Sequence, residues 1–131
     1  MTFKPAVKLF DICTLDEEID LTGSKIVKFS YKNIEQPVKN WTEMYQSVLK
    51  MLHSEDKSIL IKLAANSDFN TELSLHVSNK NEDFTKCSEI DDGIYVWINT
   101  STQYKINTLK KFFKRYNADP SELLFFLKTE I

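Results

Sequence analysis

The clearest chemical signal in the sequence is a set of four basic residues, Lys110, Lys111, Lys114 and Arg115, in a stretch that has no acidic residue from position 101 to 117. Their spacing places them opposite the apolar side of a predicted helix. Such a run is most often only a solvated helix face. A basic stripe of this kind also suits the phosphates of a nucleic acid or the surface of an acidic protein.

The basic stretch contrasts with the charge of the rest of the chain. Residues 101–117 hold five of the seventeen basic residues, which leaves twelve bases against nineteen acids elsewhere, a formal net charge of −7. That acidic remainder repels nucleic acid from most directions of approach. We therefore expect Lys110, Lys111, Lys114 and Arg115 to bind an acidic protein partner, with nucleic acid as the second possibility.

Other residue types that support catalysis form no recognisable constellation. His53 and His76 are the two histidines, and neither lies in a catalytic or metal-binding motif, so both are predicted to be solvated or capping side chains. Glu89, Asp91 and Asp92 lack the alternating ligands and turn glycine of a calcium loop, and a solvated acidic loop is expected there. The sequence therefore predicts no catalytic residue, no metal site and no cofactor, and we expect a protein that is not an enzyme.

The cysteines and glycines agree with this expectation. Cys13 and Cys87 have no metal-type spacing and are predicted to be reduced and to act as small hydrophobic side chains, although a disulfide between them remains an alternative. Gly23 and Gly93 are too far apart to form a glycine-rich phosphate loop.

The basic residues lie on a predicted helix that is flanked by two predicted strands. An apolar run at 94–98 predicts a buried strand, the pattern of 103–116 predicts an amphipathic helix, and a second apolar run at 123–127 predicts another strand. Thr100 and Gln103 have the spacing of a capping box, while Asn117 and Pro120 are expected to end the helix. If the two strands are parallel, this order predicts a right-handed crossover within one sheet.

The preceding chain predicts further elements. Residues 25–31 and 34–38 read as a β-hairpin through Lys32-Asn33, and Asn40 begins a helix that carries Trp41 on its apolar face. Ser54 is predicted to cap a second helix over 55–65, followed by a strand at 73–77 and a long polar connector at 78–93. Residues 1–24 are expected to be an N-terminal extension or an edge strand containing Phe3, Val7, Leu9 and Phe10. The fold class is α+β, with one small domain over 25–131.

The overall composition bounds the class of protein. The chain has 131 residues, of which 42% are hydrophobic and 27% charged, which is ordinary for a globular protein. Its apolar runs are far too short to span a bilayer, and its first residues lack the apolar region of a signal peptide. We expect a cytoplasmic protein that does not enter membranes.

Beyond these patterns, the chain resembles a small module from bacterial restriction-type proteins. In that module a tryptophan opens a helix after a hairpin, and a variable loop leads to a strand with the pattern I-x-x-G-I-Y-V-x-x-N-x-S, followed by a helix and a final strand. The corresponding residues here lie within 25–128 and are Trp41, Leu49, Leu52, Ile90, Gly93, Ile94, Tyr95, Val96, Asn99, Ser101 and Leu109.

In the larger proteins this module follows a ParB-like (GmrSD-type) main domain that bears a DGQQR motif, and this sequence has no such motif. The resemblance therefore transfers no catalytic residue. It implies a non-catalytic interaction module associated with a phage-defence or restriction system. The alternative is a small phage-encoded or immunity-type inhibitor that binds a bacterial defence protein or toxin, since such a protein is also a compact domain with asymmetric charge.

Overall fold

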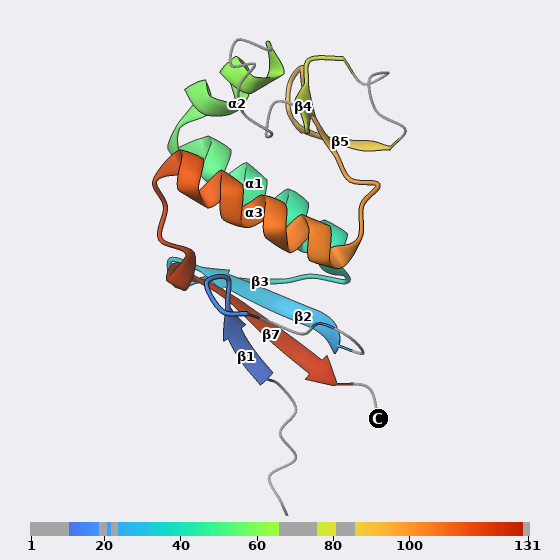
Figure 1. Cartoon of the computed structure of the whole chain (residues 1–131), viewed down its shortest axis with the longest axis vertical. Helices are drawn as coiled ribbons and strands as arrows, with labels where there is room; N and C mark the ends of the chain where they lie inside the picture. Colours follow the sequence, from blue (N-terminus) through green and yellow to red (C-terminus); the bar gives the residue numbers. More distant parts are fainter. Residues whose placement is uncertain (1–10, 19–20, 22–23, 66–75, 81–85, 130–131) are drawn as a thin grey trace, which may run out of the picture. The chain divides into compact units, whose positions relative to one another are not determined.

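A computed structural model describes residues 11–18, 21, 24–65, 76–80 and 86–129 of the chain. Within these residues the fold is α+β, as predicted, with three α-helices and two antiparallel sheets (Figure 1). Contacts divide the chain into two compact units. The first unit comprises residues 1–44 and 119–131, and the second unit comprises Tyr45–Ala118. The prediction of one domain over residues 25–131 stays a prediction.

The first unit is built on a four-stranded antiparallel sheet in the order β1-β7-β2-β3. The strands are β1 (Asp11–Thr14), β2 (Ser24–Tyr31), β3 (Ile34–Pro37) and β7 (Leu123–Thr129). A short 3-10 turn, η3 (Pro120–Glu122), leads into β7. The last strand of the chain therefore lies between β1 and β2, so the sheet combines segments from both ends of the sequence. Phe3, Val7, Leu9 and Phe10, expected in an edge strand, lie outside the described residues.

The predicted hairpin is confirmed. Lys32 and Asn33 both have positive φ, at 51° and 67°, which is the backbone conformation that a two-residue hairpin turn requires at both positions. The pairing of β2 with β7 shifts register between Ile26 and Lys28, which marks a β-bulge. The bulge changes which side chains turn inward, so that Ile26 is buried and Val27 is only half-buried.

Helix α1 (Trp41–Glu55) begins as expected. The Asn40 side chain accepts a hydrogen bond from the Glu43 amide at 2.8 Å, and the Glu43 carboxylate accepts from the Lys39 amide at 3.0 Å. These two bonds satisfy amides that the helix itself leaves without partners. Trp41 is half-buried, with its ring edge-on to Phe125 at 5.5 Å, so it is less enclosed than a core residue.

The second unit contains the rest of α1, helices α2 (Lys57–Ala64) and α3 (Thr102–Tyr116), and a three-stranded antiparallel sheet in the order β4-β6-β5. Its strands are β4 (Val77–Ser78), β5 (Cys87–Asp91) and β6 (Ile94–Trp97). Helix α2 contacts β4 and β6. Helices α1 and α3 run side by side in the same direction (Figure 1). Their first turns are neighbours, with Tyr104 near Tyr45, and so are their last turns, with Tyr116 near Glu55.

Two predictions about the second unit are wrong. Helix α2 is capped by Asp56, whose carboxylate accepts from the Ser58 amide at 3.0 Å, whereas the Ser54 hydroxyl donates back to the Met51 carbonyl within α1. The predicted connector at 78–93 contains β5, an edge strand paired with β6 through Asp92-Gly93. An edge strand tolerates polar residues because only its inward side chains, here Ile90, need to be apolar.

The predicted strand-helix-strand unit exists, but its two strands do not share a sheet. Strand β6 belongs to the sheet of the second unit and β7 to the sheet of the first, so there is no crossover within one sheet. Because β7 pairs antiparallel with both of its neighbours, it fills the middle of a sheet that β6 does not enter.

Among the described residues, no helix combines the length and apolar composition that a membrane crossing requires.

Candidate binding surface

The candidate surface is the outward side of α3, and the helix is fixed at both ends. The Ser101 hydroxyl accepts a hydrogen bond from the Tyr104 amide at 3.1 Å, which makes Ser101, and not the predicted Thr100, the N-terminal cap. Asn117 ends the helix in the left-handed conformation with φ of 57°, as the sequence predicts.

The inward side of α3 is buried. Ile106, Leu109, Phe112 and Phe113 are all at most 1% exposed, as their spacing predicts. This burial fixes the rotation of the helix about its axis. The opposite side is therefore held outward by the packing of the helix.

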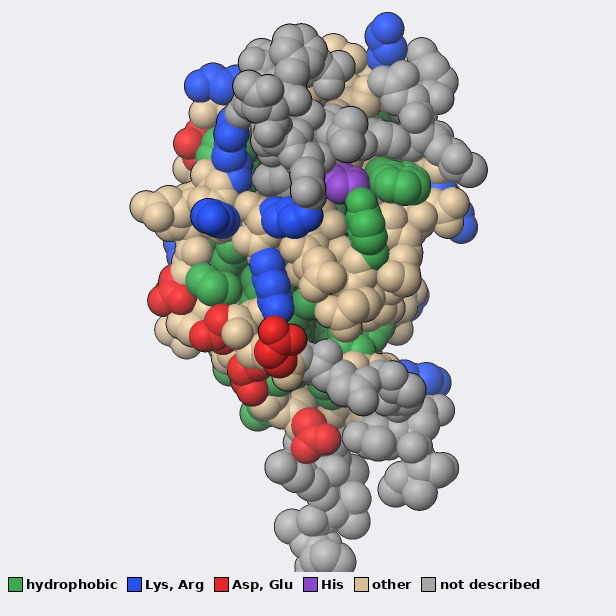
Figure 2. Space-filling model, in the orientation of Figure 1, with side chains coloured by type: hydrophobic (Ala, Val, Ile, Leu, Met, Phe, Trp, Pro, Cys, Tyr) green, Lys and Arg blue, Asp and Glu red, His purple; other side chains and the backbone are tan. Residues whose placement is uncertain are grey.

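The four predicted binding residues lie on that outer side. Lys111, Lys114 and Arg115 are exposed and Lys110 is half-buried. Figure 2 shows Lys and Arg side chains gathered on the face where α3 lies in Figure 1. We call Lys110, Lys111, Lys114 and Arg115 the basic face of α3. The structure brings all four together on one helix surface, and whether they bind a partner stays a prediction.

Lys105 does not belong to the basic face. Its side chain is only 4% exposed, and its ammonium donates to the Thr100 carbonyl at 2.6 Å. Burial lowers the pKa of Lys105 from its usual value, because a charged ammonium is poorly solvated there. The bond ties the first turn of α3 to the chain just before it, so Lys105 has a structural role.

An aromatic cluster adjoins the first turn of α3, and the sequence did not predict it. His76 stacks on Trp97 with ring centroids 5.9 Å apart and an interplanar angle of 14°. The Tyr104 ring is edge-on to His76 at 5.4 Å, and its hydroxyl lies 3.2 Å from His76 Nε2. His76 is 5% exposed, so its prediction as a solvated side chain is wrong. His76 is far from Trp97 and Tyr104 in sequence, so no local pattern indicates the cluster.

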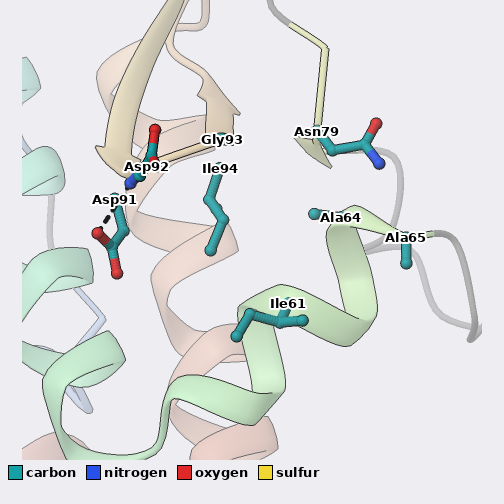
Figure 3. Close-up of a pocket in the computed structure, with 8 residues that line it drawn as sticks. All are labelled: Ile61, Ala64, Ala65, Asn79, Asp91, Asp92, Gly93 and Ile94. Atoms are coloured by element: carbon teal, nitrogen blue, oxygen red, sulfur yellow. Dashed lines mark hydrogen bonds between the residues drawn. The ribbon is translucent and has the colours of Figure 1, made fainter.

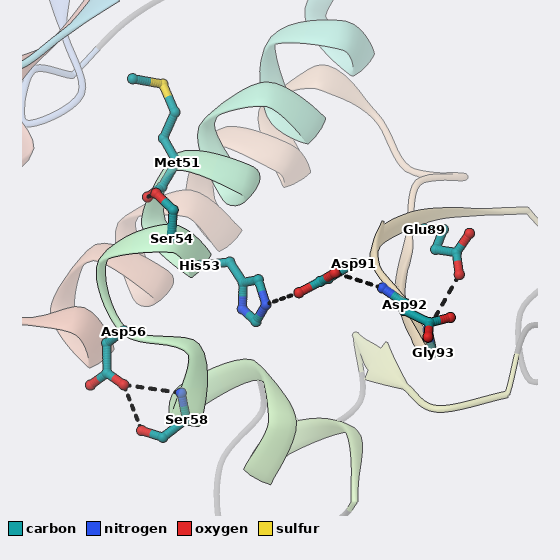
Figure 4. Close-up of polar contacts among 9 residues, drawn as sticks. All are labelled: Met51, His53, Ser54, Asp56, Ser58, Glu89, Asp91, Asp92 and Gly93. Atoms are coloured by element: carbon teal, nitrogen blue, oxygen red, sulfur yellow. Dashed lines mark hydrogen bonds and ion pairs between the residues drawn. The ribbon is translucent and has the colours of Figure 1, made fainter.

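His53 is also buried, at 4% exposed, and the prediction of a solvated or capping side chain is wrong for it too. Its Nε2 lies 2.9 Å from the Asp91 carboxylate, which joins the end of α1 to the end of β5 (Figure 4). The pKa of Asp91 is held below its usual value, first by the hydrogen bond from the Asp92 amide and then by His53. His53 Nδ1 is buried with no hydrogen-bond partner among the described residues.

The acidic residues of the β5–β6 turn support the turn itself. Glu89, Asp91 and Asp92 are exposed, as predicted. Asp91 accepts from the Asp92 amide at 2.8 Å and Glu89 accepts from the Gly93 amide at 3.3 Å (Figure 4). Within the described residues, no group of three or more His, Cys, Asp or Glu side chains is placed to hold a metal ion.

A pocket of about 310 Å³ lies between α2 and the β5–β6 turn (Figure 3). Ile61, Ala64, Ala65 and Ile94 supply its apolar wall. Asp91 also lines it, but Figure 3 shows this carboxylate turned aside toward its hydrogen-bond partner. Asn79 and Asp92 are its other polar lining residues. The pocket has the size of a small-ligand site, but among the lining residues that the structure describes the polar groups do not converge to orient a ligand (Figure 3).

Cys13 and Cys87 are not joined by a disulfide, and both are half-buried. Burial, followed by the nearby carboxylates of Glu17 and Asp11, raises the pKa of Cys13 to about 11. Because the thiolate is the reactive form, Cys13 is a poor nucleophile at neutral pH.

Comparisons with known proteins add no identification. No protein-family model matches the chain, and searches of curated proteins and of solved structures find no match. The resemblance to a restriction-associated module therefore stays a prediction from the residues that carry it.

Proposed function

We propose that the protein is a non-catalytic interaction module that binds an anionic partner through the basic face of α3. The observation that carries this proposal is the combination of three exposed cations and one half-buried cation on a helix side that contains no acid. Like charges in close array give a local positive potential that attracts an anionic surface.

The short range of charge interactions explains how an anionic partner can bind a chain whose net charge is −2. At physiological ionic strength, charges more than about 8 Å apart are largely screened from each other in solvent. A partner in contact with α3 therefore responds mainly to the helix side that it touches. The acidic remainder of the chain slows its approach from other directions. Added salt screens the attraction to the basic face, so binding weakens as salt rises.

Membership of a restriction or phage-defence system is a further part of the proposal, and it rests on the residue resemblance alone. A binding role agrees with such a module, because an accessory domain recruits or positions a partner while another domain carries out the chemistry. Neighbouring genes that encode restriction proteins would support this part, and toxin or phage genes would favour an inhibitor.

The proposal is tested by charge reversal. Binding of the full chain to fluorescein-labelled polyglutamate, single-stranded DNA and duplex DNA is measured by anisotropy between 20 and 300 mM salt. We expect at least one probe to bind at low salt and to be released as salt rises. Lys111→Glu/Lys114→Glu should abolish that binding.

The matched control is Lys39→Glu/Lys50→Glu, which changes the net charge by the same amount at exposed lysines outside α3. It should retain most of the binding. If none of the three probes binds at low salt, or if both double variants lose affinity equally, the basic face is only a solvated helix surface and the proposal is wrong.

A further inference from the structure

The outer side of α3 carries more than cations. Tyr104 lies on the same helical arc as Lys111 and Arg115, seven and eleven residues further along, and its side chain is 43% exposed. At a rise of about 1.5 Å per residue, this strip extends for roughly 16 Å. An exposed aromatic ring therefore lies at one end of the strip and exposed cations lie at the other.

The ring is held in a fixed position. Its hydroxyl lies 3.2 Å from His76 Nε2, and its edge faces the His76 ring at 5.4 Å and the Trp97 ring at 6.2 Å. Trp97 is half-buried, and Figure 2 shows a histidine side chain beside hydrophobic side chains on this surface. Rings that are already ordered lose little entropy when a ligand stacks on them.

Two amide side chains flank this strip: Gln103 comes just before Tyr104, and Asn107 lies between Tyr104 and Lys111 along the helix. Gln103 and Asn107 are both exposed, and the Gln103 amide donates to the Asn107 side-chain oxygen at 3.2 Å. Each retains further donor or acceptor positions that face solvent. One helix surface thus presents a stacking ring at its start, two hydrogen-bonding amides next to the ring, and cations further along.

We propose that this strip binds single-stranded nucleic acid, with a base stacked at Tyr104 and Trp97 and the backbone phosphates at Lys111, Lys114 and Arg115. The inference rests on the proposed function, because it names the anionic partner of the same face. Aromatic side chains beside a basic track are the usual means by which proteins hold single strands.

The same features disfavour the other two anionic partners. In duplex DNA the bases are stacked inside the helix and cannot stack on Tyr104. Lysine is depleted in protein–protein interfaces, whereas three of the four cations here are lysines. Lysines beside an ordered stacking surface are therefore our reason to place a single strand before the acidic protein that the sequence favours. The acidic remainder of the chain opposes binding, so we expect salt-sensitive affinity, with a log–log slope near −2 for three phosphates at about −0.7 each.

The test compares Tyr104→Leu with Tyr104→Phe in binding to a labelled dodecamer of deoxythymidine. Tyr104→Phe keeps the ring and loses only the hydroxyl, so its affinity should stay within about twofold of the wild type. Tyr104→Leu removes the stacking surface and should weaken binding roughly tenfold or more. Circular dichroism and the melting temperature establish that both variants are folded.

A second readout does not depend on a variant of Tyr104. The chain has two tryptophans, so Trp41→Phe leaves Trp97 as the single indole reporter. Stacking of a base near Trp97 should quench its fluorescence on addition of the dodecamer, and polyglutamate should leave it unchanged.

The outcomes separate this inference from the proposed function. Preferential binding of the single strand, with weakening in Tyr104→Leu and quenching at Trp97, supports both. Equal binding of single strand, duplex and polyglutamate, with no effect of Tyr104→Leu and no quenching, overturns the single-strand inference while the proposed function stands. Absence of binding to all three probes at low salt overturns both.

Discussion

At the residue scale, the buried histidines are the most informative side chains of the second unit. His53 joins α1 to β5 through Asp91, and His76 connects the strand region to α3 through Tyr104. Each pairs a buried imidazole with an oxygen from another element. Such bonds specify how elements are placed within a unit, because an imidazole buried without a partner costs free energy.

The Asp91 contact predicts a pH dependence of stability. A carboxyl whose pKa is lower in the folded than in the unfolded state stabilises the fold above the unfolded-state pKa, and this contribution is lost as pH falls through the folded-state pKa. Asp91→Asn should therefore lower the melting temperature at pH 7. The difference from the wild type should shrink as pH falls through the lowered folded-state pKa, where the carboxyl gains a proton.

Thermal melts of the wild type and Asp91→Asn between pH 2.5 and 7 measure this effect. Asp92→Asn is the control, since it makes the same chemical change at the neighbouring exposed position. A difference between wild type and Asp91→Asn that does not vary with pH would contradict the assignment to the Asp91 charge.

At the scale of elements, the ends of α3 are set by short-range contacts. Ser101 accepts from the Tyr104 amide, whereas Thr100 contributes its backbone carbonyl to Lys105. A main-chain carbonyl is unaffected by a change of its own side chain. The two neighbouring residues, which have similar side chains, therefore have different roles.

Ser101→Ala should destabilise the protein by about 1 kcal/mol, the usual cost of losing a hydroxyl cap. Thr100→Ala should have a smaller effect, because its carbonyl still accepts the Lys105 bond. Chemical denaturation of both variants measures the two free energies of unfolding. A larger loss in Thr100→Ala than in Ser101→Ala would place the cap at the position predicted from sequence.

At the scale of the whole molecule, the order of the strands makes the first unit depend on the last segment of the chain. Strand β7 lies between β1 and β2 and pairs with both. Within the described part of the chain, β1 has β7 as its strand partner. The sheet order β1-β7-β2-β3 therefore requires residues 123–129.

Removal of residues 119–131 deletes β7, the strand that pairs with β1, and should therefore expose Cys13 to solvent. The pKa of Cys13 should fall from about 11 toward the 9.0 of a free thiol, so its thiolate fraction near pH 8 should rise roughly 100-fold. The rate of reaction with a thiol reagent, measured in a Cys87→Ser background, reports this change. Removal of only the last two residues should leave the rate unchanged; slow labelling after the longer truncation would contradict the role of β7.

Sequence by itself determined the features that depend on neighbours in the chain. Lys32-Asn33 predicts its hairpin because the turn needs two residues that tolerate positive φ, and Asn40 with Glu43 predicts the start of α1 through side chains that reach nearby amides. The buried and basic sides of α3 follow from helical spacing in the same way. Asp92-Gly93 between two short runs is a local signal of the same kind, since it is typical of a hairpin and indicates β5.

Tertiary structure alone decided the features that join distant segments. Apolar runs at β6 and β7 predict two strands but not their sheets, because the pairing partners of β7 lie about a hundred residues away in the chain. His53 meets Asp91 across 38 positions and His76 meets Tyr104 across 28. The residues next to a histidine in the sequence do not indicate that it is buried, because its hydrogen-bond partner comes from a distant segment that approaches only when the chain folds. The placement of the aromatic cluster beside the basic face was therefore decided by tertiary structure.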